Sequence, residues 1–224
     1  MPFSAFAVKF HRSLAMLALL FGLQGCGGPG AARQLASLPT DQAVLPDKAI
    51  VVVATDFREE TWLRDVSYVG DVFFRKLDDN YPRRGKADYD FGIEGSDAAD
   101  WRATFGGADE NRAPHVFVIA PGRYVIEKIN FGSNATTAGP GFDAARNRVR
   151  YGEFTVAAGE VVNLGRLALL QHWWEGYFDA RADDDSAEVH DFLAAKYPKL
   201  AAAVETRLLT VVRRFAFQEG GGRL

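Results

Sequence analysis

The histidines of this chain are the first residues to consider for metal or proton-transfer chemistry. Beyond the first 25 residues they are His115, His172 and His190, and none of them lies at ligand spacing from another. The zinc-protease motif His-Glu-x-x-His and the hydrolase motif Gly-x-Ser-x-Gly are both absent from the sequence. We therefore expect no metal site, no cofactor and no catalytic residues.

Acidic side chains are the second candidates for chemistry. Asp56, Glu127 and Glu160 are of the type that acts as a general acid or base, but their positions along the chain do not group them in space. Glu160 also has a structural explanation, because Gly159 can turn the chain there while the carboxylate accepts backbone N–H groups. The acidic run 183–185 lacks the alternation and the glycine of a calcium-binding loop, so we interpret it as a solvated linker before a helix.

A cluster of aromatic side chains follows His172. Trp173, Trp174 and Tyr177 each combine a large apolar ring with a polar edge, and such rings stack on sugars or contact protein partners. Aromatic side chains also pack against the surface of their own protein. We name these three aromatics as candidate ligand or partner contacts, with packing as the alternative.

Cys26 is the only cysteine of the chain, and the residues before it define its chemistry. The first 12 residues contain Lys9 and Arg12 but no acid, and residues 14–23 form an apolar run. This is the pattern of a secretory signal peptide. The apolar run is too short to cross a bilayer as a helix, which takes about 20 residues. We predict that residues 1–25 are a cleaved signal peptide.

Leu23, Gly25 and Cys26 together resemble the lipobox of bacterial lipoproteins, Leu-x-Gly-Cys. The resemblance implies cleavage before Cys26, a diacylglycerol thioether on its sulfur, and acylation of the new amino terminus with a fatty acid such as palmitate. Stable anchoring takes more than one acyl chain, which this modification supplies. In such lipoproteins an aspartate directly after the cysteine would keep the protein from the outer membrane. Gly27 at this position therefore implies that the protein is located on the periplasmic face of the outer membrane. Residues 26–47 are then the lipidated cysteine and a flexible tether.

The composition is that of an ordinary folded domain. Hydrophobic residues make up 48% of the 224 residues, which is enough for a packed core. Loss of residues 1–25 removes two basic residues and no acid, so the net charge changes from −3 to −5. A mildly acidic chain lacks the basic face that nucleic acid requires, so we expect no nucleic-acid partner.

Residues 48–178 are predicted to form a β-sandwich. Pro121-Gly122 suits a type II turn and residues 157–160 form a second turn, so each is predicted to close an antiparallel hairpin. Two successive hairpins predict an antiparallel, mainly β fold. Runs with the length and β-branched content of strands lie at 49–55, 66–77, 115–120, 123–131, 149–156 and 161–170, with weaker ones at 89–93 and 101–105.

The spacing of apolar residues then becomes helical, so residues 179–217 are predicted to be a helical segment. Asp185 and Glu188 resemble a capping box, and Pro198 is expected to begin a second helix. The apolar stripe of that helix would contain Leu200, Val204 and Leu208. Residues 218–224 include three consecutive glycines and are expected to be a disordered tail.

Two segments resemble a group of uncharacterised bacterial lipoproteins. They are Pro-Gly-Arg-Tyr-Val-Ile at 121–126 and Phe-Thr-Val-Ala-Ala-Gly-Glu-Val-Val-Asn-Leu-Gly at 154–165. The resemblance covers about residues 114–170 and implies a sandwich like prealbumin or the carboxypeptidase-regulatory domain. Asn163 departs from the pattern, since an aromatic residue is common there. A shared sandwich fold gives no function by itself.

The function expected from the sequence is a non-catalytic binding or structural role in the cell envelope, with an envelope protein or a glycan as partner. One alternative is a hydrolase of an envelope polymer, which would place two acids on either side of a pocket. Another is an accessory subunit of an envelope complex that docks through its carboxyl-terminal helices. Exposure of Leu200, Val204 and Leu208 would favour the subunit.

Overall fold

The computed structural model describes residues 43–60, 65–68, 70–77, 89–93, 113–131, 136–138, 142–143, 148–149, 151–172 and 174–216. The chain separates into two units, Met1–Ala31 and Ala32–Leu224, and every described residue belongs to the second. Cys26, most of the predicted tether, the strand predicted at 101–105 and the tail at 218–224 lie outside the described residues.

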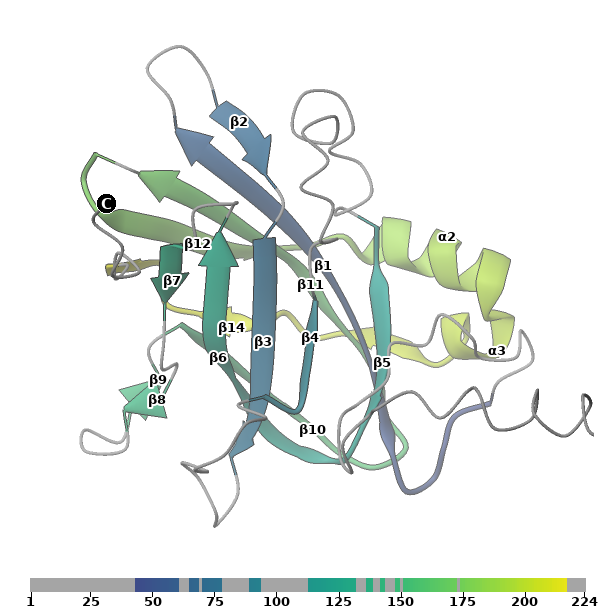
Figure 1. The fold of residues 1–224 in the computed structure, drawn as a ribbon. Helices are drawn as coiled ribbons and strands as arrows, with labels where there is room; N and C mark the ends of the chain where they lie inside the picture. The colour runs from purple at the N-terminus through teal and green to yellow at the C-terminus, as the bar shows by residue number, and fades with distance from the viewer. Residues whose placement is uncertain are drawn as a thin grey trace, which may run out of the picture. The chain divides into compact units, whose positions relative to one another are not determined.

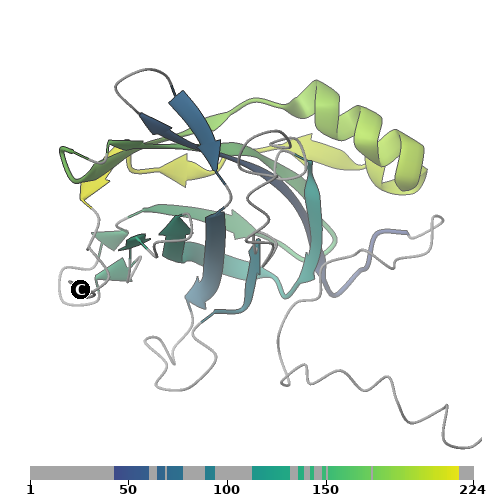
Figure 2. The ribbon, with the colours of Figure 1, turned by 45° about the horizontal axis from the view of Figure 1, so that its top comes forward.

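Two β-sheets pack against each other, which confirms the mainly β sandwich (Figure 1; Figure 2). Sheet A consists of β1 (Ala49–Glu60), β2 (Asp65–Tyr68), β5 (His115–Ile119), β11 (Val161–His172), β12 (Tyr177–Asp183), β13 (Val204–Thr206) and β15 (Arg214–Ala216). Sheet B consists of β3 (Gly70–Leu77), β4 (Phe91–Ile93), β6 (Gly122–Phe131), β7 (Thr136–Ala138), β10 (Gly152–Val156) and β14 (Thr210–Val211). β8 (Phe142–Asp143) and β9 (Arg148–Val149) pair with each other. Most strand pairs are antiparallel, but β11 runs parallel to both β1 and β13.

Aromatic rings fill much of the space between the two sheets. Phe91 of sheet B stacks on Phe74 at 4.7 Å between ring centroids and meets Phe117 of sheet A at 4.9 Å. Tyr124 stacks on Phe154 at 5.2 Å. These side chains are at most 7% exposed, and full burial of a large apolar side chain contributes about 1.5–3 kcal/mol. The core therefore joins the two sheets through these rings together with the aliphatic side chains around them.

Both predicted hairpins are wrong, because each turn leads from one sheet to the other. The Pro121-Gly122 turn connects β5 of sheet A to β6 of sheet B, and residues 157–160 connect β10 of sheet B to β11 of sheet A. The two corners lie at the same end of the sandwich, since Val156 pairs with Gly122. Turn-forming residues indicate where the chain reverses, but they do not indicate whether it returns in the same sheet.

Glu160 stabilises the second corner, as its structural interpretation expects. Its carboxylate accepts the backbone N–H of Ala157 at 2.7 Å, and Gly159 has the left-handed φ of +80° that turns the chain. Arg207 binds the same carboxylate at 3.0 and 3.2 Å and donates to the carbonyl of Thr155. The hydrogen bond from Arg207 is the main cause that holds the pKa of Glu160 below its usual value.

The predicted carboxyl-terminal helical segment is only partly helical. α2 (Ser186–Lys196) and α3 (Pro198–Ala201) are present, and Pro198 begins α3 as predicted. The second helix does not continue to Leu208, because residues 204–216 form β13, β14 and β15. These strands pair with β11 of sheet A, β10 of sheet B and β12 of sheet A in turn, so the segment joins the two sheets along one side.

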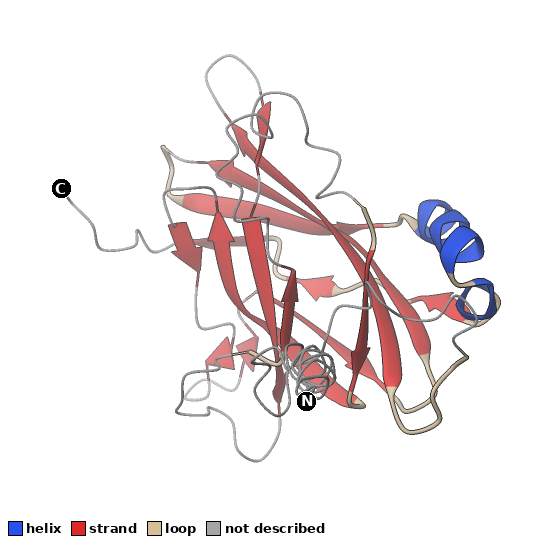
Figure 3. Ribbon diagram, turned by 45° about the vertical axis from the view of Figure 1, so that its right-hand side comes forward, coloured by secondary structure: helices blue, strands red, loops and turns tan. Residues whose placement is uncertain are grey.

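The helices cover part of the outer face of sheet A, which is the face turned away from sheet B (Figure 3). Val189, Leu193 and Leu200 of the helices pack with Ile50 and Val52 at the start of β1. This contact explains why the first residues of β1 are apolar on both faces. Val44, near the end of the predicted tether, packs against the same cluster.

An extra residue in β11 decides which side chains face outward. Val162 and Leu164 point into the core, but after Gly165 it is Leu167 and Leu169 that do so. The pairing of β1 with β11 shifts at this point, and Gly165 has a φ of +78°. This is a β-bulge with glycine in the left-handed conformation. It turns the even-numbered residues from 166 to 172 to the outer face, where β1 also presents its even-numbered residues.

We predict that Gly165→Ala lowers the free energy of unfolding by at least about 2 kcal/mol, because a left-handed alanine is strained and its Cβ would lie 2.6 Å from the backbone oxygen of Asp183. Gly159→Ala is the matched control, with a φ of +80° and nothing within 4 Å of an added Cβ. Urea unfolding measures both. Equal losses in the two variants would show that the contact at the bulge does not matter.

Candidate functional site

A shallow hollow lies on the outer face of sheet A, beyond the part that the helices cover. It has a volume of about 200 Å³ and is bordered by three neighbouring strands. Ala168 and Leu170 of β11 form its apolar floor. The residues that line it are Asp56 and Arg58 of β1, Ala168, Leu169 and Leu170 of β11, and Asp179, Ala180 and Arg181 of β12.

The charged side chains around this hollow form ion pairs. Arg58 donates to Asp56 at 2.7 and 3.1 Å, and Arg181 donates to Asp183 at 2.8 and 2.9 Å. Asp179 accepts two hydrogen bonds from Arg214 of β15, at 2.7 and 3.1 Å. The surface therefore presents fixed, alternating charges rather than a field of one sign.

His172 lies at the edge of the hollow, where β11 ends, and is bound on both sides. Its Nδ1 contacts the carboxylate of Glu60, and its Nε2 lies 3.0 Å from Oδ2 of Asp179. The imidazole stacks on the Tyr177 ring, with 4.4 Å between the ring centroids. The guanidinium of Arg214 lies over the same tyrosine ring, 4.1 Å from its centroid. Hydrogen bonds from Arg214, followed by those from His172, hold the pKa of Asp179 below its usual value.

The predicted aromatic contacts fall in and beside the hairpin that joins β11 to β12. Trp174 is 83% exposed, and Tyr177 stacks on His172 as described. Phe178, by contrast, is fully buried in the core. Trp173 lies outside the described residues. The sequence-based interpretation of this region as a contact surface therefore agrees with the exposure of Trp174 and stays untested for Trp173.

The acids predicted as catalytic candidates are not brought together. Asp56 lies on the outer face of sheet A, Glu127 lies on β6 beside Arg75 at 3.7 Å, and Glu160 lies at the corner with Arg207. The other two histidines of the domain are also apart. His115 is on β5, where burial lowers its pKa, and His190 is exposed on α2.

A buried polar pair beneath α2 is a feature that the sequence analysis missed. Asn163 is fully buried, donates to Oδ1 of Asp185 at 2.9 Å and accepts the N–H of Gly165 at 2.9 Å. Asp185 precedes α2 but makes no side-chain capping hydrogen bond, so the predicted capping box with Glu188 is wrong. Glu188 instead binds Arg166. The one signal in the sequence was a polar amide, Asn163, between the apolar residues Val162 and Leu164 of a predicted strand.

No known protein family, curated protein or solved structure matches this chain. The likeness of residues 114–170 to bacterial lipoproteins therefore remains a prediction from the motifs.

We predict that Asp185→Asn becomes progressively more stable than the wild type as the pH rises. Burial raises the pKa of Asp185 above its ordinary value of 3.8, in spite of the hydrogen bond from Asn163. The folded state thus binds this proton more tightly than the unfolded state does. The stabilisation that results is complete at pH values below 3.8 and is lost as the pH rises through the raised pKa. Asparagine keeps the acceptor for Asn163 without this loss.

Urea unfolding at about pH 4 and about pH 7 measures the difference between the two proteins. Asp185→Ala serves as the control, because it leaves the amide of Asn163 without its acceptor and is expected to cost about 1–3 kcal/mol at either pH. A constant difference between wild type and Asp185→Asn at both pH values would contradict the raised pKa.

Proposed function

We propose that the protein is a lipid-anchored, non-catalytic binding protein of the bacterial cell envelope, and that the outer face of sheet A binds a glycan. The observation that carries the proposal is a hollow with an apolar floor and charged walls on β1, β11 and β12, together with the exposed indole of Trp174 in the hairpin that joins β11 to β12. A sugar ring has an apolar face that stacks on an aromatic side chain and hydroxyl groups that hydrogen-bond to carboxylates and guanidinium groups.

The placement of the acids favours binding over hydrolysis. A hydrolase of this type needs two carboxyl groups on either side of the reacting bond, one of them with a raised pKa. Asp56 and Asp179 border the hollow, but Asp56 forms an ion pair and the pKa of Asp179 is lowered. Asp179 therefore lacks the raised pKa that a general acid requires.

The burial of the helices counts against docking through the carboxyl-terminal segment. Leu200 is fully buried, together with Val189 and Leu193, against the outer face of sheet A. Only Leu208 of the predicted stripe is exposed, at 42%, and it lies outside any helix. The helices therefore complete the fold of their own domain.

The proposed surface lies toward the end of β1 that is farther from the point where the described chain begins. The chain enters the domain at Ala49, and the hollow lies toward the other end of this 12-residue strand. At about 3.3 Å per residue, the strand covers roughly 40 Å.

The proposed cellular location of the protein rests on the lipobox alone. Among the described residues, no helix is both long and apolar enough to cross a lipid bilayer. We predict that radioactive palmitate labels the wild type in bacterial cells and that Cys26→Ala abolishes the label, because the acceptor sulfur is lost and processing depends on it. Equal labelling of both proteins would refute lipid anchoring.

The glycan proposal is tested by co-sedimentation with purified cell-wall polysaccharide. We expect Trp174→Ala to weaken binding roughly three- to tenfold, the value of one aromatic stacking contact. Tyr89→Ala is the matched control, since Tyr89 is also a partly exposed aromatic, at 38%, but packs on Phe73 of sheet B. No sedimentation of the wild type, or equal loss in both variants, would overturn the proposal.

A further inference from the structure

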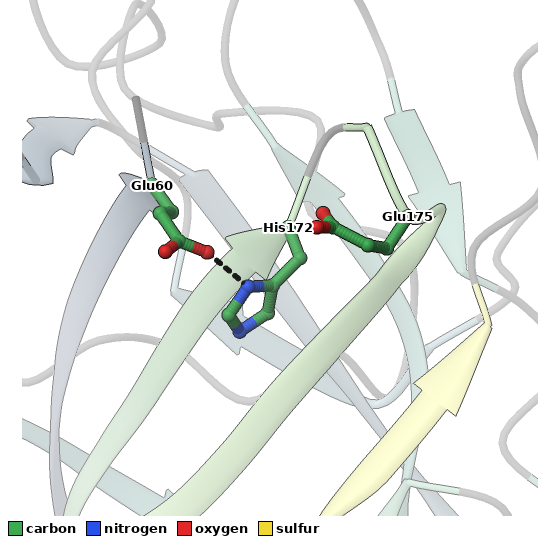
Figure 4. A group of neighbouring side chains, drawn as sticks. All are labelled: Glu60, His172 and Glu175. Atoms are coloured by element: carbon green, nitrogen blue, oxygen red, sulfur yellow. Dashed lines mark hydrogen bonds and ion pairs between the residues drawn. The ribbon is translucent and has the colours of Figure 1, made fainter. Parts of the chain in front are cut away.

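Three side chains with metal-binding groups converge where strands β1 and β11 of sheet A end. Glu60 ends β1, His172 ends β11, and Glu175 lies in the hairpin turn that follows. One donor atom from each lies within 4.8 Å of the other two. Figure 4 shows the Glu60 carboxylate facing the imidazole, with the Glu175 carboxylate beside them.

Groups outside this cluster fix the orientation of the imidazole. Asp179 contacts Nε2 of His172 at 3.0 Å and is itself held by two hydrogen bonds from Arg214. Tyr177 stacks on one face of the ring. A histidine that binds metal through one nitrogen commonly donates its other N–H to a carboxylate, which sets the tautomer and the direction of the ring. With the proton on Nε2, the nitrogen that faces Glu60 is the one able to bind a cation.

The charge of this edge suits a divalent cation. When His172 is neutral, the carboxylates of Glu60, Glu175 and Asp179 together with the guanidinium of Arg214 leave two negative charges. Glu60 is half exposed, at 51%, and Glu175 is also exposed, so both can adjust to a metal ion. Their exposure also leaves water able to complete the coordination.

The donor atoms indicate which cation is preferred. Calcium and magnesium are bound almost entirely by oxygen, whereas an imidazole favours first-row transition metals and zinc. One histidine nitrogen and two carboxylate oxygens are all ligand types that zinc accepts, and water can fill an open position. The expectation from sequence of no metal site considered only spacing along the chain, and Glu60 is 112 residues from His172.

We propose that Glu60, His172 and Glu175 bind a divalent transition-metal ion, with zinc the best match, and that Asp179 is a positioning residue for the imidazole. The ion would tie the end of β1 to the hairpin that carries Trp174. The proposal does not depend on glycan binding, and either can fail without the other.

Isothermal titration of the full-length chain with zinc chloride tests the proposal. The protein is purified in detergent through a tag without histidine and stripped with EDTA. We expect one zinc ion per chain at this site, with calcium and magnesium far weaker. His172→Asn, Glu60→Gln and Glu175→Gln are each expected to reduce zinc affinity at least tenfold, and Asp179→Asn about tenfold.

His190→Asn is the matched control, since His190 also lies beside a carboxylate, that of Asp191 at 3.8 Å, but on the exposed face of α2. Its zinc affinity should equal that of the wild type. Urea unfolding without metal separates coordination from folding, because the two exposed glutamate variants should unfold like the wild type. Zinc binding that survives in His172→Asn, or that His190→Asn reduces equally, would overturn the proposal.

Discussion

The left-handed bulge at Gly165 is the constraint on which the arrangement of sheet A depends. Before it, the even-numbered residues of β11 face the core, and after it the odd-numbered residues do so. A strand without the extra residue would bury His172 and expose Gln171, which is now 1% exposed. The bulge thus allows one strand to serve both the core and the outer face, and the buried amide of Asn163 binds the backbone of Gly165 itself.

The outer face of sheet A has two halves with different physical roles. The first half is apolar because α2 and α3 cover it, and burial there contributes to stability. The second half carries the ion pairs around the hollow. Solvent-exposed ion pairs contribute only about 0–1 kcal/mol each, so stability alone does not account for them. The proposed glycan binding would give this polar and concave half a role that its ion pairs do not have in stability.

Much of the fold follows from local sequence patterns. The β-branched run at 49–55 and the alternation at 123–131 predict strands β1 and β6, and the spacing of Val189 and Leu193 predicts α2. The connections were harder, because a turn sequence such as Pro121-Gly122 is equally compatible with a hairpin and with a corner between sheets. The apolar spacing of Leu200, Val204 and Leu208 fits a helix, but pairing with β10, β11 and β12 outweighs that local preference.

The candidate site was less predictable than the fold, since it depends on contacts between distant segments. The aromatic residues after His172 were identified from their types alone. Their neighbours Glu60 and Arg214 lie near opposite ends of the domain's sequence. Only the pairing of β1, β11, β12 and β15 brings them together. Gly165 inside a strand pattern was a signal for a bulge, but its effect on the facing of His172 requires the three-dimensional register.

Anomalous diffraction at the zinc absorption edge tests the central claim most directly, namely that the register set by the bulge creates a cation site on the outer face of sheet A. Crystals of the chain grown with equimolar zinc should show a peak among Glu60, His172 and Glu175, with Asp179 on the opposite side of the imidazole. A map with no peak there, or with zinc only at His190, would contradict the account.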